Sequence, residues 1–122
     1  MDRRLRLREL IQKERDEENP QIDLSDMNFQ ALRPSVIHYG QEQLEILTDG
    51  FTNQIGHGGS GRVYKGKALD SEMAIAVKCL KEGEIYIKMW KTELTLLNKF
   101  QHKNIINLVG YCPAYPSLAK LS

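Results

Sequence analysis

Residues 56–63 read Gly-His-Gly-Gly-Ser-Gly-Arg-Val and fit the pattern G-x-G-x-x-G-x-V. Alone this pattern is weak evidence, because any tight turn that needs positive φ angles can carry the same glycines. A dinucleotide-binding loop would open a helix, whereas Val63 and Tyr64 suit a strand. A Walker loop would need Lys and then Ser or Thr after Gly61, where Arg62 and Val63 stand. The stretch therefore predicts a glycine-rich β-hairpin whose backbone N–H groups can approach phosphate oxygens.

The residues on both sides of this hairpin predict an α+β fold, with a twisted antiparallel sheet and one packed helix. Hydrophobic patterns predict strands at residues 51–57, 61–68, 73–80 and 106–111, and a helix at residues 84–99. Pro113 and Pro116 argue against a further strand, because each proline removes a ladder donor. Residues 113–122 are therefore expected to form an irregular tail.

The first 50 residues predict less structure than the rest. Leu7, Leu10 and Ile11 have helical spacing, so residues 1–18 are a candidate amphipathic helix within a partly disordered N-terminal segment. Its basic residues crowd the N-terminal end, which opposes the helix dipole. Residues 19–50 are expected to be a linker, with a short helical turn near residues 41–48.

Lys78 is expected to return to the glycine hairpin. Folding the second and third strands antiparallel about residues 70 and 71 brings Lys78 opposite Val63. Strand alternation puts Ala76 on the same face, and Ile55 should join it from the first strand. This face would offer apolar walls for a flat heterocycle and an ammonium group for phosphates. Taken alone, the strand favours the alternative of an ordinary strand that ends in an exposed lysine.

The predicted helix carries an acid on its apolar stripe. The stripe is formed by large side chains at intervals of three, four or seven residues: Tyr86, Met89, Trp90, Leu97 and Phe100. Glu93 falls on this stripe, and a buried carboxylate persists only when it is paired. A nearby cation is therefore predicted, and Lys78 is the candidate. The alternative is a Glu93 at the margin of the stripe that reaches water.

Together these motifs resemble the protein kinase small lobe, over residues 51–112. In family order they are I-G-x-G-x-x-G-x-V at residues 55–63, I-A-V-K at 75–78, Glu93, H-x-N-I at 102–105 and L-x-G at 108–110. The spacing from Val63 to Lys78 and from Lys78 to Glu93 is also similar to that of the family. The L-T-D-G-F lead-in at 47–51 and V-G-Y-C at 109–112 look most similar to receptor-like and interleukin-receptor-associated kinases.

The resemblance implies a protein that binds ATP through its glycine loop. Gly56, Gly58 and Gly61 would shape the phosphate loop, Lys78 would hold the α- and β-phosphates, and Glu93 would hold Lys78. The implied nucleotide-binding set is Ile55, Gly56, His57, Gly58, Gly59, Ser60, Gly61, Arg62, Val63, Ala76 and Lys78. Ser60 stands where the family commonly has an aromatic residue, and His57 is expected to be an exposed imidazole without a catalytic role.

The residues with which this family completes phosphoryl transfer and binds Mg²⁺ are not in the sequence. The family uses an Asp in H-R-D, an Asn for one magnesium ion and the Asp of D-F-G. His38, His57 and His102 are followed by Tyr, Gly and Lys, and residues 49–51 read Asp-Gly-Phe. A fifth strand and the adenine-binding hinge are also expected to be absent, which would leave the strand at 106–111 without its usual neighbour.

Bulk composition gives no sign of a nucleic acid partner or of a membrane span. Lys and Arg total 17 against 16 Asp and Glu, so a net charge of +1 gives no reason to expect a nucleic acid partner. The sequence has no apolar run long enough to span a membrane. Cys79 and Cys112 fit reduced core thiols of a cytoplasmic protein.

Two hypotheses follow for function. The first is a Ser/Thr or dual-specificity protein kinase, seen here as a truncated and inactive piece, with ATP and a protein substrate or adaptor as partners. The second is a non-catalytic kinase-like binding module that acts as a decoy or scaffold in receptor signalling. In either case an apolar face of the helix at 84–99 is expected to be exposed.

Overall fold

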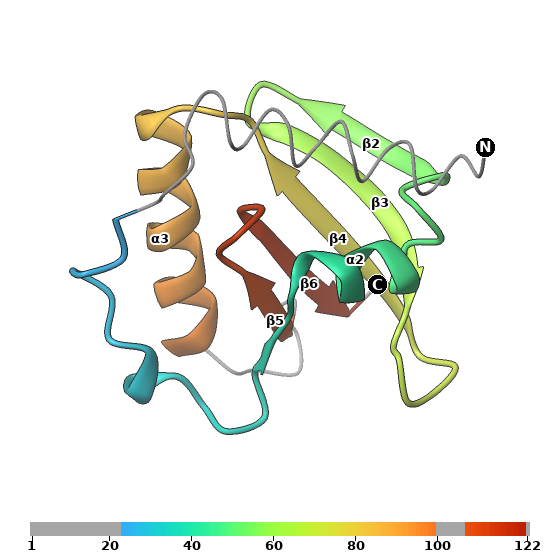
Figure 1. The fold of residues 1–122 in the computed structure, drawn as a ribbon, viewed down its shortest axis with the longest axis horizontal. Helices are drawn as coiled ribbons and strands as arrows, with labels where there is room; N and C mark the ends of the chain where they lie inside the picture. The colour runs from blue at the N-terminus through green and yellow to red at the C-terminus, as the bar shows by residue number, and fades with distance from the viewer. Residues whose placement is uncertain (1–22, 100–106, 122) are drawn as a thin grey trace.

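The computed structural model describes residues 23–99 and 107–121. Its elements in chain order are the 3-10 helix η1 (Phe29–Ala31), β1 (Ile37–His38), α2 (Gln41–Leu47), β2 (Gln54–Gly58), β3 (Gly61–Lys67), β4 (Ala74–Leu80), α3 (Glu84–Lys99), β5 (Leu108–Cys112) and β6 (Ser117–Leu121). Within the described residues, six strands form one sheet in the order β1-β5-β6-β4-β3-β2. Figure 1 labels the strands from β2 to β6. The β1–β5 pair is parallel and the other pairs are antiparallel, so the sheet is mixed.

The fold agrees with the predicted α+β class and kinase-like small lobe, with one correction at its centre. Residues 117–121 form β6, which pairs antiparallel with both β4 and β5. The expected irregular tail and missing fifth strand are therefore wrong. Pro113 and Pro116 lie in the turn before β6, where neither removes a donor from the ladder. The Pro116 carbonyl instead accepts a 3.0 Å hydrogen bond from the backbone N–H of Leu80.

One face of the sheet is apolar and is covered by α2. Ile75 and Val77 of β4 are fully buried and pack in one cluster with Leu44 and Leu47 of α2. Figure 1 shows α2 crossing in front of β4 and β6. The same cluster contains Cys79 and Cys112, so both lie in the core, as the sequence predicted.

The other face of the sheet receives α3. Trp90 and Leu94 of this helix are completely buried and pack with Leu80 of β4 and Leu118 of β6. The Trp90 indole Nε1–H donates a 3.0 Å hydrogen bond to the Ser117 carbonyl, which ties the helix to the central strand. The ring therefore contributes both apolar burial and a satisfied donor.

The apolar stripe of α3 differs in part from the predicted one. Met89 is 41% exposed, whereas Leu94, which was not placed on the stripe, is in the core. Phe100 and the expected helix at residues 1–18 lie outside the described residues. The bounds of α3 agree with the predicted helix at 84–99, and α2 agrees with the expected helical turn.

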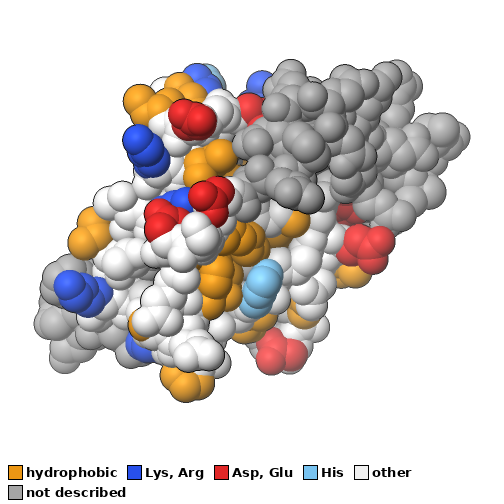
Figure 2. All heavy atoms as spheres, turned by 60° about the vertical axis from the view of Figure 1, so that its left-hand side comes forward, with side chains coloured by type: hydrophobic (Ala, Val, Ile, Leu, Met, Phe, Trp, Pro, Cys, Tyr) orange, Lys and Arg blue, Asp and Glu red, His pale blue; other side chains and the backbone are white. Residues whose placement is uncertain are grey.

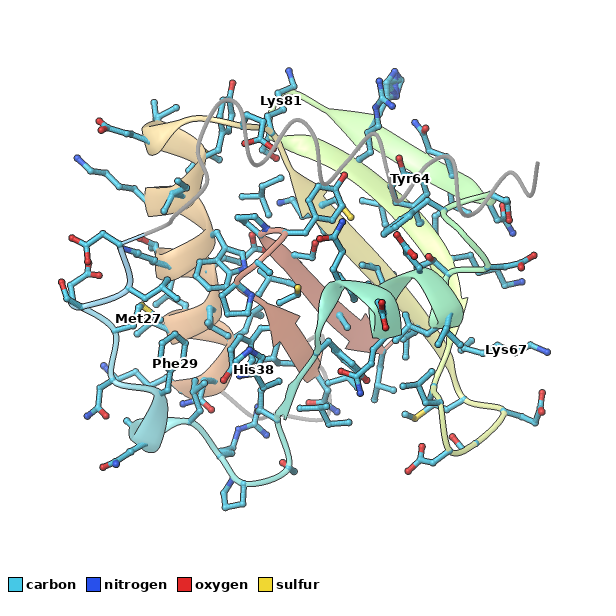
Figure 3. All side chains as sticks on the ribbon, viewed as in Figure 1. Met27, Phe29, His38, Tyr64, Lys67 and Lys81 are labelled. Atoms are coloured by element: carbon cyan, nitrogen blue, oxygen red, sulfur yellow. The ribbon has the colours of Figure 1, made fainter. Side chains whose placement is uncertain are left out.

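Residues 23–36, which we name the strap, run along α3 rather than forming a plain linker. Arg33 donates its backbone N–H to Asn98 Oδ1 at 2.8 Å, and Asn98 Nδ2 donates to the Ala31 carbonyl at 3.2 Å. Lys91 of α3 lies 2.7 Å from Asp26 Oδ1. Figure 3 shows Met27 and Phe29 of the strap beside α3. These contacts join the strap to one side of the helix.

Another side of α3 presents apolar side chains to solvent, as the sequence predicted. Ile85, Met89 and Leu96 are all more than 40% exposed and recur at helical spacing. The space-filling view toward this side shows hydrophobic side chains between charged ones (Figure 2). Clustered exposed apolar residues of this kind are typical of contact surfaces.

Candidate functional site: a glycine hairpin above a Lys-Glu-Lys cluster

The predicted glycine hairpin is formed by β2 and β3. Gly58 pairs with Gly61, and the two residues between them make the turn. A bulge between Gln54 and Gly56 leaves two residues of β2, Ile55 and Gly56, opposite Val63 of β3. Ile55 is 53% exposed, so the sheet edge presents an apolar side chain next to Val63.

The glycines of the hairpin have two different structural roles. A Cβ atom on Gly61 would overlap the Cys79 carbonyl oxygen, so this glycine is required by the close approach of β3 to β4. A Cβ atom on Gly58 or Gly59 would have no neighbour within 4 Å. The backbone at these two glycines is therefore open to a ligand. The Lys81 N–H donates to the Ser60 carbonyl at 3.0 Å and holds the turn against the end of β4.

Lys78 lies where the predicted strand folding puts it. β4 pairs with β3 so that Lys78 is directly opposite Val63, and Ala76 lies on the same face two residues earlier. The Lys78 Nζ is 3.3 Å from Glu93 Oε2 of α3. The contact predicted between the third strand and the helix is thus present, beneath the glycine hairpin.

Glu93 has a second partner that the sequence analysis missed. The Nζ of Lys120, in β6, lies 2.5 Å from Glu93 Oε1, so each carboxylate oxygen has its own ammonium group. β6 was not expected to exist, and its lysine was therefore not considered. The alternation of Leu118 and Lys120 after the proline turn is the signal that could have revealed it.

The cluster keeps Glu93 charged. Burial raises the pKa of Glu93, but the hydrogen bond and charge of Lys120, followed by those of Lys78, outweigh burial and hold the pKa below its usual value of 4.5. The three side chains are between 16% and 27% exposed, so the cluster is neither fully buried nor freely solvated. An ionised carboxylate with two cations leaves a net charge of +1 in the cluster.

Four residues of the predicted nucleotide-binding set line a cavity on the other side of the sheet: the side chains of His57 and Arg62, and Gly58 and Gly61 of the hairpin. His57 and Arg62 border a hollow of about 510 Å³ together with Tyr64 and Cys79. Arg62 and Tyr64 flank Val63 in β3, so strand alternation directs them to the face opposite Lys78. The structure brings together Val63, Ala76, Lys78 and Glu93, but not these two side chains.

The described residues include groups that are suited to the phosphate part of a nucleotide. The open glycine backbone and the Lys78 ammonium group are suited to phosphate oxygens. Residues 23–99 and 107–121 contain no group of three or more His, Cys, Asp or Glu side chains placed to hold a metal ion. Within the same ranges, no helix is both long and apolar enough to cross a membrane.

Comparison with protein families agrees with this geometry. Residues 50–119 match the protein kinase domain. The chain belongs to the protein kinase family. The matched residues run from the lead-in of the glycine hairpin to residue 119, so the kinase match reaches residues 117–119 of β6, the strand that the sequence analysis did not expect.

The similar kinases include receptor-like kinases of Arabidopsis thaliana. A probable LRR receptor-like serine/threonine-protein kinase is 38% identical over 94 residues, which cover 73% of this chain and 11% of the relative. The calcium/calmodulin-regulated receptor-like kinase 1 is 40% identical over 81 residues, which cover 63% of this chain and 18% of the relative. The chain thus spans less than a quarter of the length of these relatives.

Similar solved structures include kinases described as inactive. The pseudokinase DRIK1 (drought responsive inactive kinase 1), solved bound to ENMD-2076, has a TM-score of 0.64 and 25% identity. The match covers 74% of this chain and 38% of DRIK1. This likeness supports the small-lobe fold.

Proposed function

We propose that the chain is the ATP-binding small lobe of a protein kinase related to the receptor-like kinases. The observation that carries this proposal is the Lys78–Glu93 ion pair beneath an open glycine hairpin. In kinases this arrangement holds the ATP phosphates in place for transfer. Protein Ser/Thr is the proposed acceptor, because the names of similar relatives include serine/threonine-protein kinases.

Each part of the site would contribute one contact with ATP. The backbone N–H groups at Gly58 and Gly59 would bind phosphate oxygens, and Lys78 would supply a positive charge. Val63 and Ala76 would pack against the base from the sheet face. Mg²⁺, when bound, would neutralise phosphate charge. Its ligands would not be the usual motifs of the family, because those motifs are not in this sequence. Cys79 and Cys112 are both buried and are not joined in a disulfide, which supports a reducing, cytoplasmic location.

Isothermal titration of the full chain with Mg-ATP tests this function. The Lys78→Ala variant should bind at least about tenfold more weakly, since a hydrogen-bonded charge to phosphate contributes roughly 1.5–3 kcal/mol. Lys67→Ala is the matched control, because Lys67 is also a strand lysine in an ion pair but is 69% exposed. Figure 3 shows Lys67 directed away from the molecule. Equal binding by wild type and Lys78→Ala would remove Lys78 from the site.

A second candidate is a non-catalytic binding module. It is favoured by the similarity to structures described as pseudokinases and by the exposed apolar side chains of α3. This function requires no ATP affinity. A wild-type chain that fails to bind Mg-ATP at millimolar concentration, while remaining folded by circular dichroism, would favour the module over the ATP-binding lobe.

A further inference from the structure

Glu93 is shared unequally between two lysines. Its contact with Lys120 is 2.5 Å and its contact with Lys78 is 3.3 Å. The Lys120 side chain is also the less exposed of the two, at 16% against 25%. Short charge-assisted hydrogen bonds in partly desolvated sites are the stronger ones. The geometry therefore makes Lys120 the closer counter-ion of the helix carboxylate.

The position of Lys120 is determined by backbone pairing on both sides. In β6 it lies directly opposite Ala76 of β4 and opposite Leu108 of β5. A residue held by two ladders has little freedom to move its backbone. Lys78 sits two residues along β4, opposite Leu118, so the two ammonium groups approach Glu93 from neighbouring strands.

We infer that Lys120 is a positioning residue, which holds Glu93 and α3 against the sheet and so leaves Lys78 free to bind an anionic ligand. The cluster contains two ammonium groups and one carboxylate. When Lys120 neutralises Glu93, the charge of Lys78 is the surplus that a phosphate can take up. The second half of this inference rests on the proposed ATP site, whereas the first half concerns only the three side chains.

The first half is tested without any ligand. The Glu93 carboxyl pKa is measured by ¹³C NMR titration of the full chain in wild type, Lys120→Met and Lys78→Met. The pKa of Glu93 should rise in both variants, and it should rise more in Lys120→Met. A larger rise in Lys78→Met would overturn the inference. Lys120→Arg, which keeps the charge, should restore most of the wild-type pKa.

The second half is tested by titration with Mg-ATP and with inorganic tripolyphosphate. Lys120→Met should weaken both affinities about tenfold, the loss typical when a supporting partner of a binding group is removed. Lys65→Met is the matched control, because Lys65 flanks Ala76 from β3 as Lys120 does from β6, and it is exposed. Its affinity should stay within about twofold of wild type.

The possible outcomes separate the two proposals. Unchanged affinity in a folded Lys120→Met variant would overturn the role of Lys120 in ligand binding. If wild type binds neither probe, the proposed ATP site fails, while the Glu93 titration still decides whether Lys120 is the principal counter-ion. Rescue of both the pKa and the affinity by Lys120→Arg would support the complete inference.

Discussion

The two faces of strand β4 are built from alternate residues of one segment, yet they differ in chemistry. Ile75 and Val77 are fully buried in a hydrophobic cluster that includes side chains of α2. Ala76 and Lys78 point to the α3 side and keep partial contact with solvent. The one charged side chain of β4, Lys78, therefore lies on the α3 face.

This difference shows how a small domain can combine stability with a polar site. Burial of apolar surface is the main source of stability, and it needs a face from which water is excluded. Ion pairs contribute little net stability, but they can orient a side chain for binding. Substitutions on the two faces should therefore separate stability from ligand binding.

The largest expected effect is on the apolar face. Ile75→Ala should lower the free energy of unfolding by about 2–5 kcal/mol, because it removes buried methyl groups and leaves a cavity. Urea unfolding of the full chain measures this loss. Ile75→Val is the control and should cost about 0.5–1.5 kcal/mol. If Ile75→Ala lowers the free energy of unfolding by less than about 2 kcal/mol, this face is not the stable core.

A smaller effect is expected at the glycines of the hairpin. Gly61→Ala should destabilise the fold by about 1–3 kcal/mol, because the added methyl group would overlap the Cys79 carbonyl. Gly58→Ala has open space and should change stability by no more than about 0.5 kcal/mol. It should nevertheless weaken Mg-ATP binding, since its methyl group would stand between the backbone and a phosphate. Similar unfolding midpoints for the two variants would contradict the close approach of β3 to β4.

The smallest effect is expected from the charged cluster and should depend on pH. The pKa of Glu93 is lower in the folded chain than its usual value of 4.5, so its ion pairs stabilise the fold above that pH. Their contribution is lost as the pH falls below 4.5 and through the lowered pKa. Because the group is partly solvated, we expect a contribution of only about 1 kcal/mol.

Unfolding midpoints of wild type and Glu93→Gln between pH 7 and pH 3 measure this contribution. The two proteins should differ at neutral pH and converge in acid, where the carboxylate of wild type is protonated. A difference that stays constant over this range would show that the glutamine acts through packing and not through charge.

Much of the fold could be predicted because its signals are local. The periodicity of residues 84–99 predicted α3, and the register of β3 with β4 followed from the position of the connecting turn. The contact between Lys78 and Glu93 was predicted from an acid on an apolar stripe. These inferences need only neighbouring residues and strand alternation.

The errors occurred where a local signal was outweighed by tertiary pairing. Two prolines suggested that no strand follows β5, but both lie in the turn. The strand β6 forms after them because it pairs with β4 on one side and with β5 on the other. The strap has no sustained period, because its contacts are with α3, more than 60 residues away in sequence. Met89 was placed in the core for a similar reason, since periodicity does not show which side of a helix the sheet covers.

The sequence by itself determined the glycine hairpin, the lysine that returns to it, the acid on the following helix and the membership of a kinase-like small lobe. Only the tertiary structure decided that a central strand carries a second lysine to that acid, and that His57 and Arg62 face away from it. The physical reason is range. Turns and periodicity act between neighbouring residues, whereas the partner of a partly buried charge depends on strand order and on the packing of distant segments.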